Sequence, residues 1–258
     1  MSRIPVETGS NGTLARRSFV KLCATTAAVV SASPHILAQT AAAPLKLYER
    51  VRLLDAGGKP LKASSLAAGA SLIFNYPFAT TPCFLLNLGK TVNDSVTLHT
   101  ESGAAYLWPG GVGAEQSVVA FSAICTHKLS HPAKAVSFIN YRHEPVSFRD
   151  QQEQLVKRSG VILCCSEKSA YDPAKGARVL GGPAKQPLCS ILLEYDDAED
   201  GLYALGSYGG EMFDRFFRQF AARLQLEWGT SDVRRSVSGS VRAVPISEYS
   251  RTQMMCGA

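Results

Sequence analysis

Cys125-Thr126-His127 is the first of three short stretches on which the interpretation of this chain rests. The second stretch, residues 164–172, reads Cys164-Cys165-Ser166-Glu167-Lys168-Ser169-Ala170-Tyr171-Asp172, and the third begins with Gly181-Gly182-Pro183-Ala184. Cysteine thiolates and histidine imidazoles are common ligands of iron and zinc. The first two stretches are therefore candidate metal-binding loops, and the rest of the chain has to supply a fold that brings them together.

Short apolar runs broken by Gly, Pro, Asn and Asp occupy the chain from Lys46 to Tyr195. The runs are rich in Val, Ile, Phe and Tyr and have the length of strands, which favours an antiparallel barrel or sandwich. The sequence therefore predicts an all-β body. The expected strands cover residues 47–54, 71–76, 83–88, 117–124, 136–141, 160–163 and 191–195.

Two segments depart from this strand pattern. Residues 148–158 (FRDQQEQLVKR) are polar and helix-compatible, and we expect an inserted helix or a long loop there. After Gly210, Met, Phe and Leu residues recur at helical spacing with arginines between them, which predicts an amphipathic helix. Its aromatic face would pack on the chain's own barrel or dock a partner subunit. The Ser- and Gly-rich tail after Trp228 is expected to be extended or wrapped around another part of the molecule.

The N-terminus has the features of a twin-arginine export signal. Arg16-Arg17 precedes a mildly apolar run from Leu22 to Ala32, and the small residue Ala38 follows. This run is too short for a membrane-spanning helix, which needs about 20 residues. We expect cleavage after Ala38 and a periplasmic protein exported in its folded state; an uncleaved signal would act as a weak anchor. Export of a folded protein also fits a cofactor inserted before export.

Charge and cysteine content narrow the class of protein. The formal net charge is +6, about half of it within residues 1–38, and this balance gives no reason to expect a nucleic-acid partner. An even number of cysteines in an oxidising compartment usually indicates disulfides, but two of these cysteines are adjacent and the spacing fits no small disulfide scaffold. At least two are therefore interpreted as metal ligands, and the pairing of the others stays open. The cysteines after the signal are Cys83, Cys125, Cys164, Cys165, Cys189 and Cys256.

The three stretches resemble the cluster-binding segments of Rieske proteins, in which a [2Fe-2S] cluster is held by Cys-x-His and Cys-x-x-His and covered by a proline-containing loop. Within that family the chain is similar to the small subunit of arsenite oxidase over residues 71–213, including Thr81-Pro82-Cys83 and Pro109-Gly110-Gly111-Val112-Gly113. The resemblance implies a Rieske-type antiparallel barrel or sandwich with a small cluster-binding subdomain over residues 39–210. A helical extension would follow over residues 211–258.

The resemblance also implies a ligand set. Cys125 and Cys164 would be thiolate ligands and His127 an imidazole ligand, whereas Glu167 stands where the family has its second histidine. A carboxylate adds negative charge and disfavours the reduced cluster, so a Glu167 ligand would lower the potential. The other candidates for the fourth ligand are His131, His143 and Cys165.

Further positions correspond to supporting residues of the family. Ser169 and Tyr171 match the hydroxyl groups that hydrogen-bond the cluster sulfurs and raise the potential, and Pro183 lies in the covering loop. The family usually braces its two loops with a disulfide, but Ser130 and Ser166 occupy those two positions here. The cysteines of that brace are thus both missing.

The function implied by the resemblance is electron transfer, without a catalytic site on this chain. Its redox partner would be the large subunit of a molybdenum enzyme or a cytochrome c. The alternatives are a cluster-free Rieske fold acting as a scaffold subunit of a redox complex, and a zinc site on the same residues. Arsenite is not carried over as a substrate, because the substrate site would lie on another chain.

Overall fold

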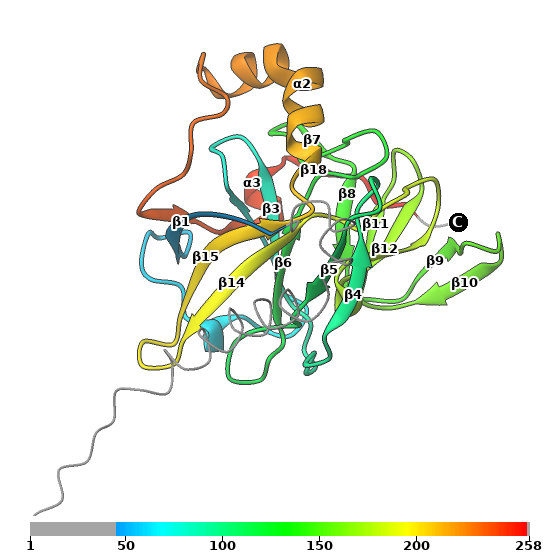
Figure 1. Cartoon of the computed structure of the whole chain (residues 1–258), viewed down its shortest axis with the longest axis horizontal. Coiled ribbons are helices and arrows are strands. Elements are labelled where there is room, and N and C mark those ends of the chain that lie inside the picture. The colour runs from blue at the N-terminus through cyan, green and yellow to red at the C-terminus, as the bar shows by residue number, and fades with distance from the viewer. Residues whose placement is uncertain (1–44, 257–258) are drawn as a thin grey trace, which may run out of the picture. The chain divides into compact units, whose positions relative to one another are not determined.

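The structure, a computed structural model, describes residues 45–256, and strands dominate these residues (Figure 1). The prediction of an all-β body is confirmed. The predicted export signal, residues 1–38, lies outside the described residues. Within residues 45–256, no helix combines the length and the apolar character needed to cross a membrane.

The largest sheet has eight strands in the order β16-β1-β15-β14-β6-β3-β2-β17. Its edge strands β16 and β17 are separated in sequence by Ala243 alone, so the sheet curls until its two edges approach each other. The result is a nearly closed barrel, antiparallel except where β16 pairs with β1. The strands are β1 (Leu45–Leu54), β2 (Ser71–Asn75), β3 (Pro82–Asn87), β6 (Val118–Ser122), β14 (Ser190–Asp196), β15 (Gly201–Tyr208), β16 (Ser240–Arg242) and β17 (Val244–Pro245).

A second, four-stranded antiparallel sheet has the order β13-β12-β11-β8. Its strands are β8 (Ile139–Arg142), β11 (Val161–Cys164), β12 (Ser169–Asp172) and β13 (Arg178–Gly181). Three small two-stranded pairings complete the strands: β4 (Val96–His99) with β5 (Ala105–Trp108), β9 (Val146–Arg149) with β10 (Leu155–Arg158), and β7 (Val136–Ser137) with β18 (Thr252–Gln253). Two short 3-10 turns, Ala63–Ser65 and Pro173–Lys175, lie between strands.

The prediction of a helix or long loop over residues 148–158 is wrong, because β9 and β10 form an antiparallel hairpin there. Asp150 starts the reversal by accepting the backbone N–H groups of Gln152 (2.9 Å) and Gln154 (3.0 Å). Val146 and Phe148 on β9 are buried, and the other face is exposed. The polar composition that resembled a helix belongs to a strand pair with one solvated face, visible beyond β11 and β12 in Figure 1.

Strand β3 separates two hydrophobic cores. Cys83 and Leu85 point into one core, whereas Phe84 and Leu86 point into the other, as the two-residue period of a strand requires. All four are fully buried, and burying a leucine or phenylalanine side chain contributes about 1.5–3 kcal/mol. The first core lies on the α2 side of the sheet, and the second lies toward the four-stranded sheet.

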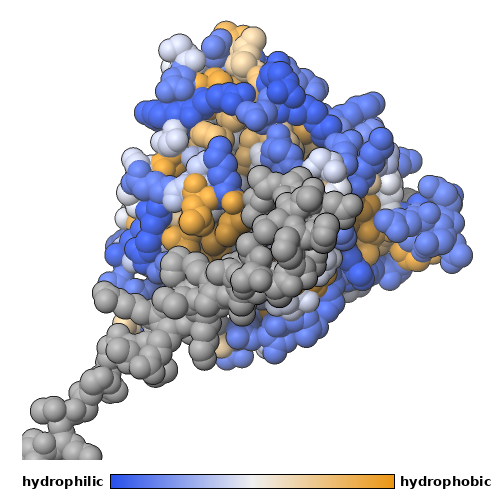
Figure 2. Space-filling model, in the orientation of Figure 1, coloured by the Kyte–Doolittle hydropathy of each residue, from blue (hydrophilic) through white to orange (hydrophobic). Residues whose placement is uncertain are grey.

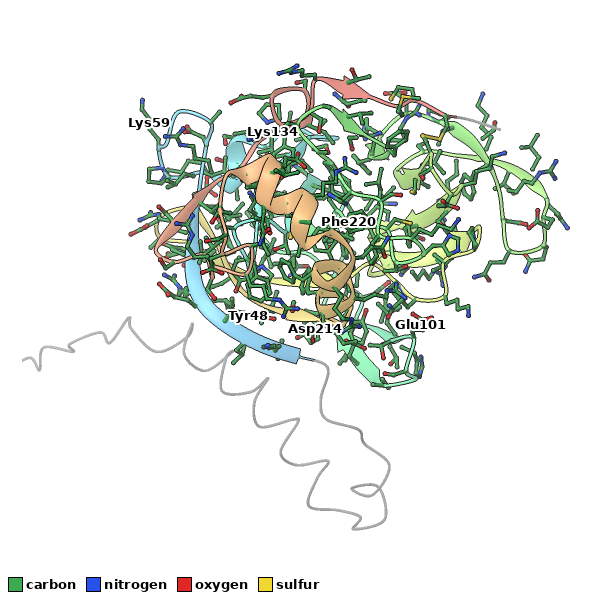
Figure 3. All side chains as sticks on the ribbon, turned by 90° about the horizontal axis from the view of Figure 1, so that it is seen from above. Tyr48, Lys59, Glu101, Lys134, Asp214 and Phe220 are labelled. Atoms are coloured by element: carbon green, nitrogen blue, oxygen red, sulfur yellow. A yellow bond between two sulfur atoms is a disulfide. The ribbon has the colours of Figure 1, made fainter. Side chains whose placement is uncertain are left out.

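Helix α2 (Met212–Trp228) packs on the first core. Phe213, Phe216 and Phe217 are buried, and Phe78 meets Phe217 edge to face at 5.2 Å. Of the two predicted roles for this aromatic face, packing on the chain's own barrel is confirmed. Figure 3 shows the helix crossing the sheet, with Phe220 along its length and Lys134 near its C-terminal end.

The chain after α2 is mostly extended, as predicted, and runs along sheet edges. β16 and β17 complete the barrel, a short helix α3 (Ile246–Tyr249) follows, and β18 pairs in parallel with β7. The last described residues therefore lie beside the strand that leads into the four-stranded sheet.

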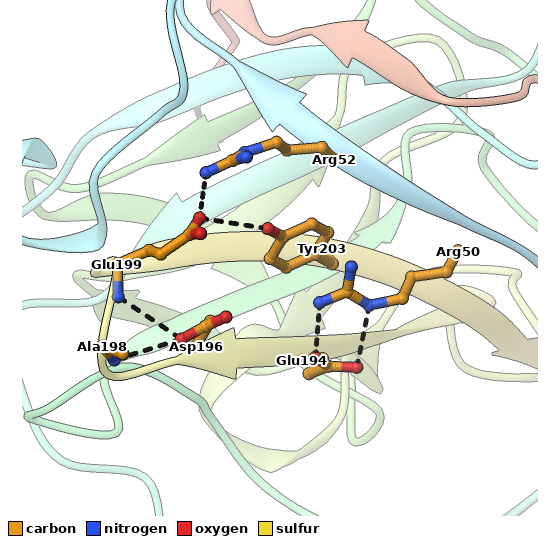
Figure 4. Close-up of polar contacts among 7 residues, drawn as sticks. All are labelled: Arg50, Arg52, Glu194, Asp196, Ala198, Glu199 and Tyr203. Atoms are coloured by element: carbon orange, nitrogen blue, oxygen red, sulfur yellow. Dashed lines mark hydrogen bonds and ion pairs between the residues drawn. The ribbon is translucent and has the colours of Figure 1, made fainter.

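The β14–β15 hairpin carries polar contacts on its outer side (Figure 4). Arg50 donates to Glu194 at 2.7 Å and Arg52 pairs with Glu199, while Asp196 accepts two backbone N–H groups in the turn. Exposed ion pairs of this kind contribute less than about 1 kcal/mol each. They identify a solvated surface, and the face drawn in Figure 2 is likewise largely hydrophilic, with apolar side chains exposed in a few places.

Candidate metal centre

The first candidate loop leaves β6 and folds back on itself. The N–H of Cys125 donates to the carbonyl of Ser130 (2.8 Å), and the N–H of Leu129 donates to the carbonyl of Cys125 (2.9 Å). Leu129 adopts a φ of 61°, which lets the chain close this tight turn. As a result Cys125 is fully buried at the base of the loop, whereas His127 is partly exposed.

The second candidate loop is the turn between β11 and β12. Cys164 and Ser169 are cross-strand partners at the end of this hairpin, and residues 165–168 form the turn. The backbone N–H groups of Ser166 and Glu167 act on the Cys164 sulfur and lower its pKa. Such N–H groups favour a thiolate over a thiol at this position.

The two loops bury Cys125 and Cys164 in the same core, close enough that each thiol shifts the pKa of the other. The neighbouring Cys164 side chain lowers the pKa of Cys125 to about 6, against the effect of burial, and Cys125 in turn raises the pKa of Cys164. The Tyr171 hydroxyl lies 3.2 Å from the Cys125 sulfur. The Ser169 hydroxyl is also buried beside this sulfur but has no hydrogen bond of good geometry.

His127 and Glu167 form a second pair. Nδ1 of His127 lies 3.5 Å from Oε2 of Glu167, and Nζ of Lys128 lies 3.4 Å from Oε1. The His127 side chain is 29% exposed, yet its Nδ1 is buried and lacks a hydrogen-bond partner. The imidazole therefore turns Nδ1 inward and presents the rest of its ring toward solvent.

A third loop, residues 182–189, packs against the other two. Gly182 has a φ of 79°, and a Cβ at this position would lie 2.3 Å from the carbonyl oxygen of Lys168. Only glycine permits this contact between the loops. The Thr126 hydroxyl donates to the carbonyl of Gln186 at 2.8 Å. Pro183, predicted to cover the centre, is exposed near the start of this loop.

Helix α2 also contacts the first loop, through a residue that the sequence did not identify. Arg215 donates to the carbonyl oxygen of Thr126 and pairs with Glu101 at 3.2 Å. Figure 3 shows Glu101 near the start of the helix, where Asp214 also lies. The helical pattern placed the arginines between the apolar positions, but nothing in it indicated this contact.

His131, one candidate for the fourth ligand, is enclosed by α2. Its ring meets Phe216 and Phe220 edge-on at 4.9 and 5.0 Å, and its Nδ1 lies 2.9 Å from the carbonyl oxygen of Leu129. Burial lowers the pKa of His131, so the neutral ring is favoured. In this position the ring belongs to the packing between the first loop and the helix.

The remaining two candidates are also engaged elsewhere. His143 is exposed, and its ring covers Gly69 so closely that a Cβ there would meet it at 2.6 Å. Cys165 is joined to Cys256 in a disulfide, which leaves it without a free thiolate. Cys83, Cys125, Cys164 and Cys189 are free and buried.

Ser130 and Ser166, which occupy the positions of the family's loop disulfide, line one small pocket of about 210 Å³ together with His131 and Arg223. The two loops thus approach each other at these positions as the resemblance implies. A disulfide is present on the second loop, but it is one residue earlier in the chain and leads to the C-terminal segment.

The donor set fits a two-iron cluster. Within residues 45–256, no three His, Cys, Asp or Glu side chains converge closely enough to hold a single metal ion. The four donors instead form two pairs, and a Rieske-type cluster takes two ligands on each iron. Buried polar atoms without partners are rare, and two of them, His127 Nδ1 and Ser169 Oγ, lie here, where a bound group would complete their contacts.

Comparison with known proteins finds relatives of this chain among iodate reductase subunits. The chain is similar to the iodate reductase subunit IdrB of Pseudomonas sp. (strain SCT), with 27% identity over 202 residues, 78% of this chain and 83% of that protein. It is also similar to IdrB of Denitromonas iodatirespirans, with 29% identity over 209 residues, 80% of this chain and 87% of that protein. The predicted resemblance to Rieske-type subunits is confirmed.

Two other comparisons add detail. The soluble domain of the Rieske protein II (soxF) from Sulfolobus acidocaldarius aligns with a TM-score of 0.42 and 22% identity, over 62% of this chain and 78% of that chain. No protein-family model matches the chain.

Proposed function

We propose that this chain is an electron-transfer subunit that carries a [2Fe-2S] cluster on Cys125, Cys164, His127 and Glu167. The observation that carries the proposal is the arrangement of donors in two pairs, each contributed by both loops. When bound, the cluster would supply one-electron redox chemistry.

The chain's own residues act on the charge of this site in opposite directions. Backbone N–H groups and the Tyr171 hydroxyl lie near the two cysteine sulfurs and favour added negative charge there, which would raise the reduction potential of the cluster. Glu167 brings a negative charge of its own and would lower this reduction potential, although Lys128 offsets part of that charge. The partly exposed ring of His127 would be the point nearest to a redox partner.

The partner that we propose is the catalytic large subunit of a molybdenum enzyme, with a cytochrome c as the other candidate. The two similar proteins described above are subunits of an iodate reductase, which supports a role within an oxidoreductase complex. We assign no substrate to this chain, because substrate chemistry would belong to the other subunit.

The proposed location is the periplasm, reached in the folded state through the twin-arginine segment. Support comes from the signal sequence and from the Cys165–Cys256 disulfide, which suits an oxidising compartment. Replacing Arg16 and Arg17 by lysine should retain the protein in the cytoplasm, as cell fractionation would show. Unchanged export of this variant would contradict the proposed route.

Iron and acid-labile sulfide analysis, with electron paramagnetic resonance of the reduced protein, tests the cluster. About two irons and a Rieske-type signal are expected. Cys125→Ser should abolish both, whereas Cys83→Ser, which changes a buried free cysteine of the other core, should retain them. Wild-type protein without iron would refute the proposal, and zinc in its place would indicate a different metal site.

The role of Glu167 needs a separate test, because it stands at the one proposed ligand position that differs from the family. If its carboxylate binds iron, Glu167→Ala should change the absorption and resonance spectra, and Glu167→His should keep a Rieske-type signal and raise the potential. Identical spectra in wild type and Glu167→Ala would exclude Glu167 as a ligand.

One observation favours a second candidate function, a cluster-free scaffold subunit. Glu167 already has a positively charged partner within the protein, Lys128 at 3.4 Å, so its charge is partly compensated without a metal. A scaffold would be colourless and would bind its partner subunit as strongly after Cys125→Ser as before. Loss of partner binding in that variant would instead favour the electron-transfer subunit.

A further inference from the structure

The Cys165–Cys256 disulfide attaches the second candidate loop to the last residues that the structure describes. Cys165 directly follows Cys164 and lies two residues before Glu167. The covalent link is therefore made within the short segment that joins two of the four proposed ligands. The two cysteines are 91 positions apart in sequence, so the link connects regions that are otherwise distant along the chain.

The C-terminal segment is a firm anchor, because it is bonded to the strands beside the loop. The N–H of Met254 donates to the carbonyl of Ser137 (2.8 Å), and the Asn140 side chain donates to the carbonyl of Met254 (3.0 Å). Arg142 donates to the carbonyl of Cys256 at 3.1 Å. These contacts fix the end of the segment on β7 and β8, the latter being a neighbour of β11 in the four-stranded sheet.

The turn that receives the link is exposed and conformationally demanding. Ser166 and Lys168 are exposed, and Lys168 adopts a φ of 55° in the left-handed region. The N–H of Cys165 donates to the carbonyl of Phe138 at 2.6 Å and holds the start of the turn, and Glu167 faces the first loop at 3.4–3.5 Å. A short exposed turn of this kind opens at low free energy unless something restrains it.

We propose that the Cys165–Cys256 disulfide is a positioning pair for the candidate metal centre. It restrains the turn between Cys164 and Glu167, so that both side chains keep facing the first loop. The positioning of cluster ligands rests on the proposed function. The restraint of the turn by the disulfide does not depend on a bound cluster. The competing role is a staple that only holds the C-terminal segment in place.

Hydrogen exchange distinguishes these two roles in protein with or without a metal. The double variant Cys165→Ala/Cys256→Ala removes the link without leaving a free thiol beside Cys164. If the link positions the loop, amides of residues 165–168 should exchange at least about tenfold faster, while those of β12 and β13 stay within about twofold of wild type. Acceleration confined to residues 250–256 would leave only the staple and overturn the proposal. Equal acceleration in β12 and β13 would mean general loosening and would overturn it as well.

A second measurement avoids mutation. A phosphine reductant supplies the two electrons that convert the disulfide into two thiols, and treated wild-type protein should show the same exchange pattern as the double variant. The double variant treated with phosphine is the control, and it should not change further. If treated wild type keeps slow exchange at residues 165–168 after both thiols are detected, the proposal is wrong.

The readout at the centre is the stability of the cluster. Iron release to a chelator should be at least about fivefold faster in the double variant, with a broadened resonance signal, because the ligand loop samples more conformations. Unchanged release and line shape would overturn the positioning role. Iron is measured in wild type first, so a failure of the proposed function appears there, whereas the exchange experiment decides the restraint independently.

Discussion

Tyr171→Phe is the substitution that tests the organisation of the centre most directly. Tyr171 is fully buried, and its hydroxyl lies 3.2 Å from the Cys125 sulfur and 3.2 Å from the Thr126 hydroxyl oxygen. It also accepts the N–H of Thr126 at 3.3 Å. Phenylalanine keeps the ring and its packing but removes all three polar contacts at once.

The expected cost follows from these contacts. The Thr126 hydroxyl keeps its bond to Gln186, but the Thr126 N–H loses its acceptor inside the protein, and a buried unsatisfied donor costs about 1–3 kcal/mol. With about 2 kcal/mol lost in a domain of about 200 residues, the melting temperature should fall by about 4–8 °C. In cluster-loaded protein the missing hydroxyl should also lower the potential by about 40–60 mV, which corresponds to about 1–1.4 kcal/mol for one electron.

Thermal unfolding of metal-free protein and redox titration of loaded protein measure the two effects separately. Tyr208→Phe is the matched control, since Tyr208 is a buried tyrosine of the same core whose ring stacks on Tyr106 at 5.5 Å. The control should keep the wild-type potential. If Tyr171→Phe melts within about 1 °C of wild type and keeps its potential, the hydroxyl has no role at the thiols and the reasoning fails.

Three further predictions concern the surroundings of the centre. His131→Phe should make the stability of the fold less sensitive to acid. Burial lowers the pKa of His131 in the folded protein, so the unfolded chain binds the proton at a higher pH than the folded protein does. The wild-type protein therefore loses stability as the pH falls below about 6.5, by up to about 1.4 kcal/mol per pH unit. Urea unfolding at pH 7.5 and pH 5.5 should therefore show a smaller difference in the variant, and an equal difference would contradict the assignment. In urea unfolding, Gly182→Ala should destabilise the protein by about 1–3 kcal/mol more than Gly103→Ala does. Both glycines have a positive φ, but only at Gly182 would a Cβ lie against backbone, at 2.3 Å. Equal urea midpoints for the two variants would exclude the clash. Arg215→Ala should lower the free energy of unfolding by about 1–2 kcal/mol and speed amide exchange in the first loop. Arg215→Lys should restore this only in part, because lysine lacks the planar guanidinium group. Unchanged exchange in Arg215→Ala would show that the contact with Thr126 does not restrain the loop.

Strands β3 and β6 of the barrel could be predicted because their residues are apolar on both faces. In β6, Val118, Val119, Ala120 and Phe121 are all buried, and such a run bounded by polar residues is typical of a core strand. The amphipathic helix could also be predicted, because Phe213, Phe216 and Phe217 recur at helical spacing and lie on one face.

The β9–β10 hairpin could not be predicted in the same way, because its signal is local and weak. Gln151, Gln152 and Glu153 favour helices, but they occupy the turn, and Asp150 takes the N–H groups that a helix would have used. The strands themselves are held by pairing and by a few buried side chains such as Phe148.

The candidate centre, too, has features that could be predicted from the sequence and features that could not. The spacing of Cys125, His127 and Cys164 indicated two ligand loops, and the structure brings these loops together. The Cys165–Cys256 link and the contact of Arg215 with the first loop join residues about 90 positions apart, and a single sequence does not specify such pairings. The identity of the fourth ligand stays a prediction for Glu167.

The parallel pairing of β16 with β1 has a consequence for how the protein acquires its structure. Residues 52–54 meet residues 240–242, and β17 closes the opposite edge against β2, so the barrel is sealed by a segment near the end of the chain. Native contacts of such long sequence separation give a high contact order, which slows folding into the range of milliseconds to seconds. Until that segment arrives, the backbone edges of β1 and β2 are open to pairing with other molecules. A chain shortened before residue 240 should therefore aggregate rather than form a smaller barrel.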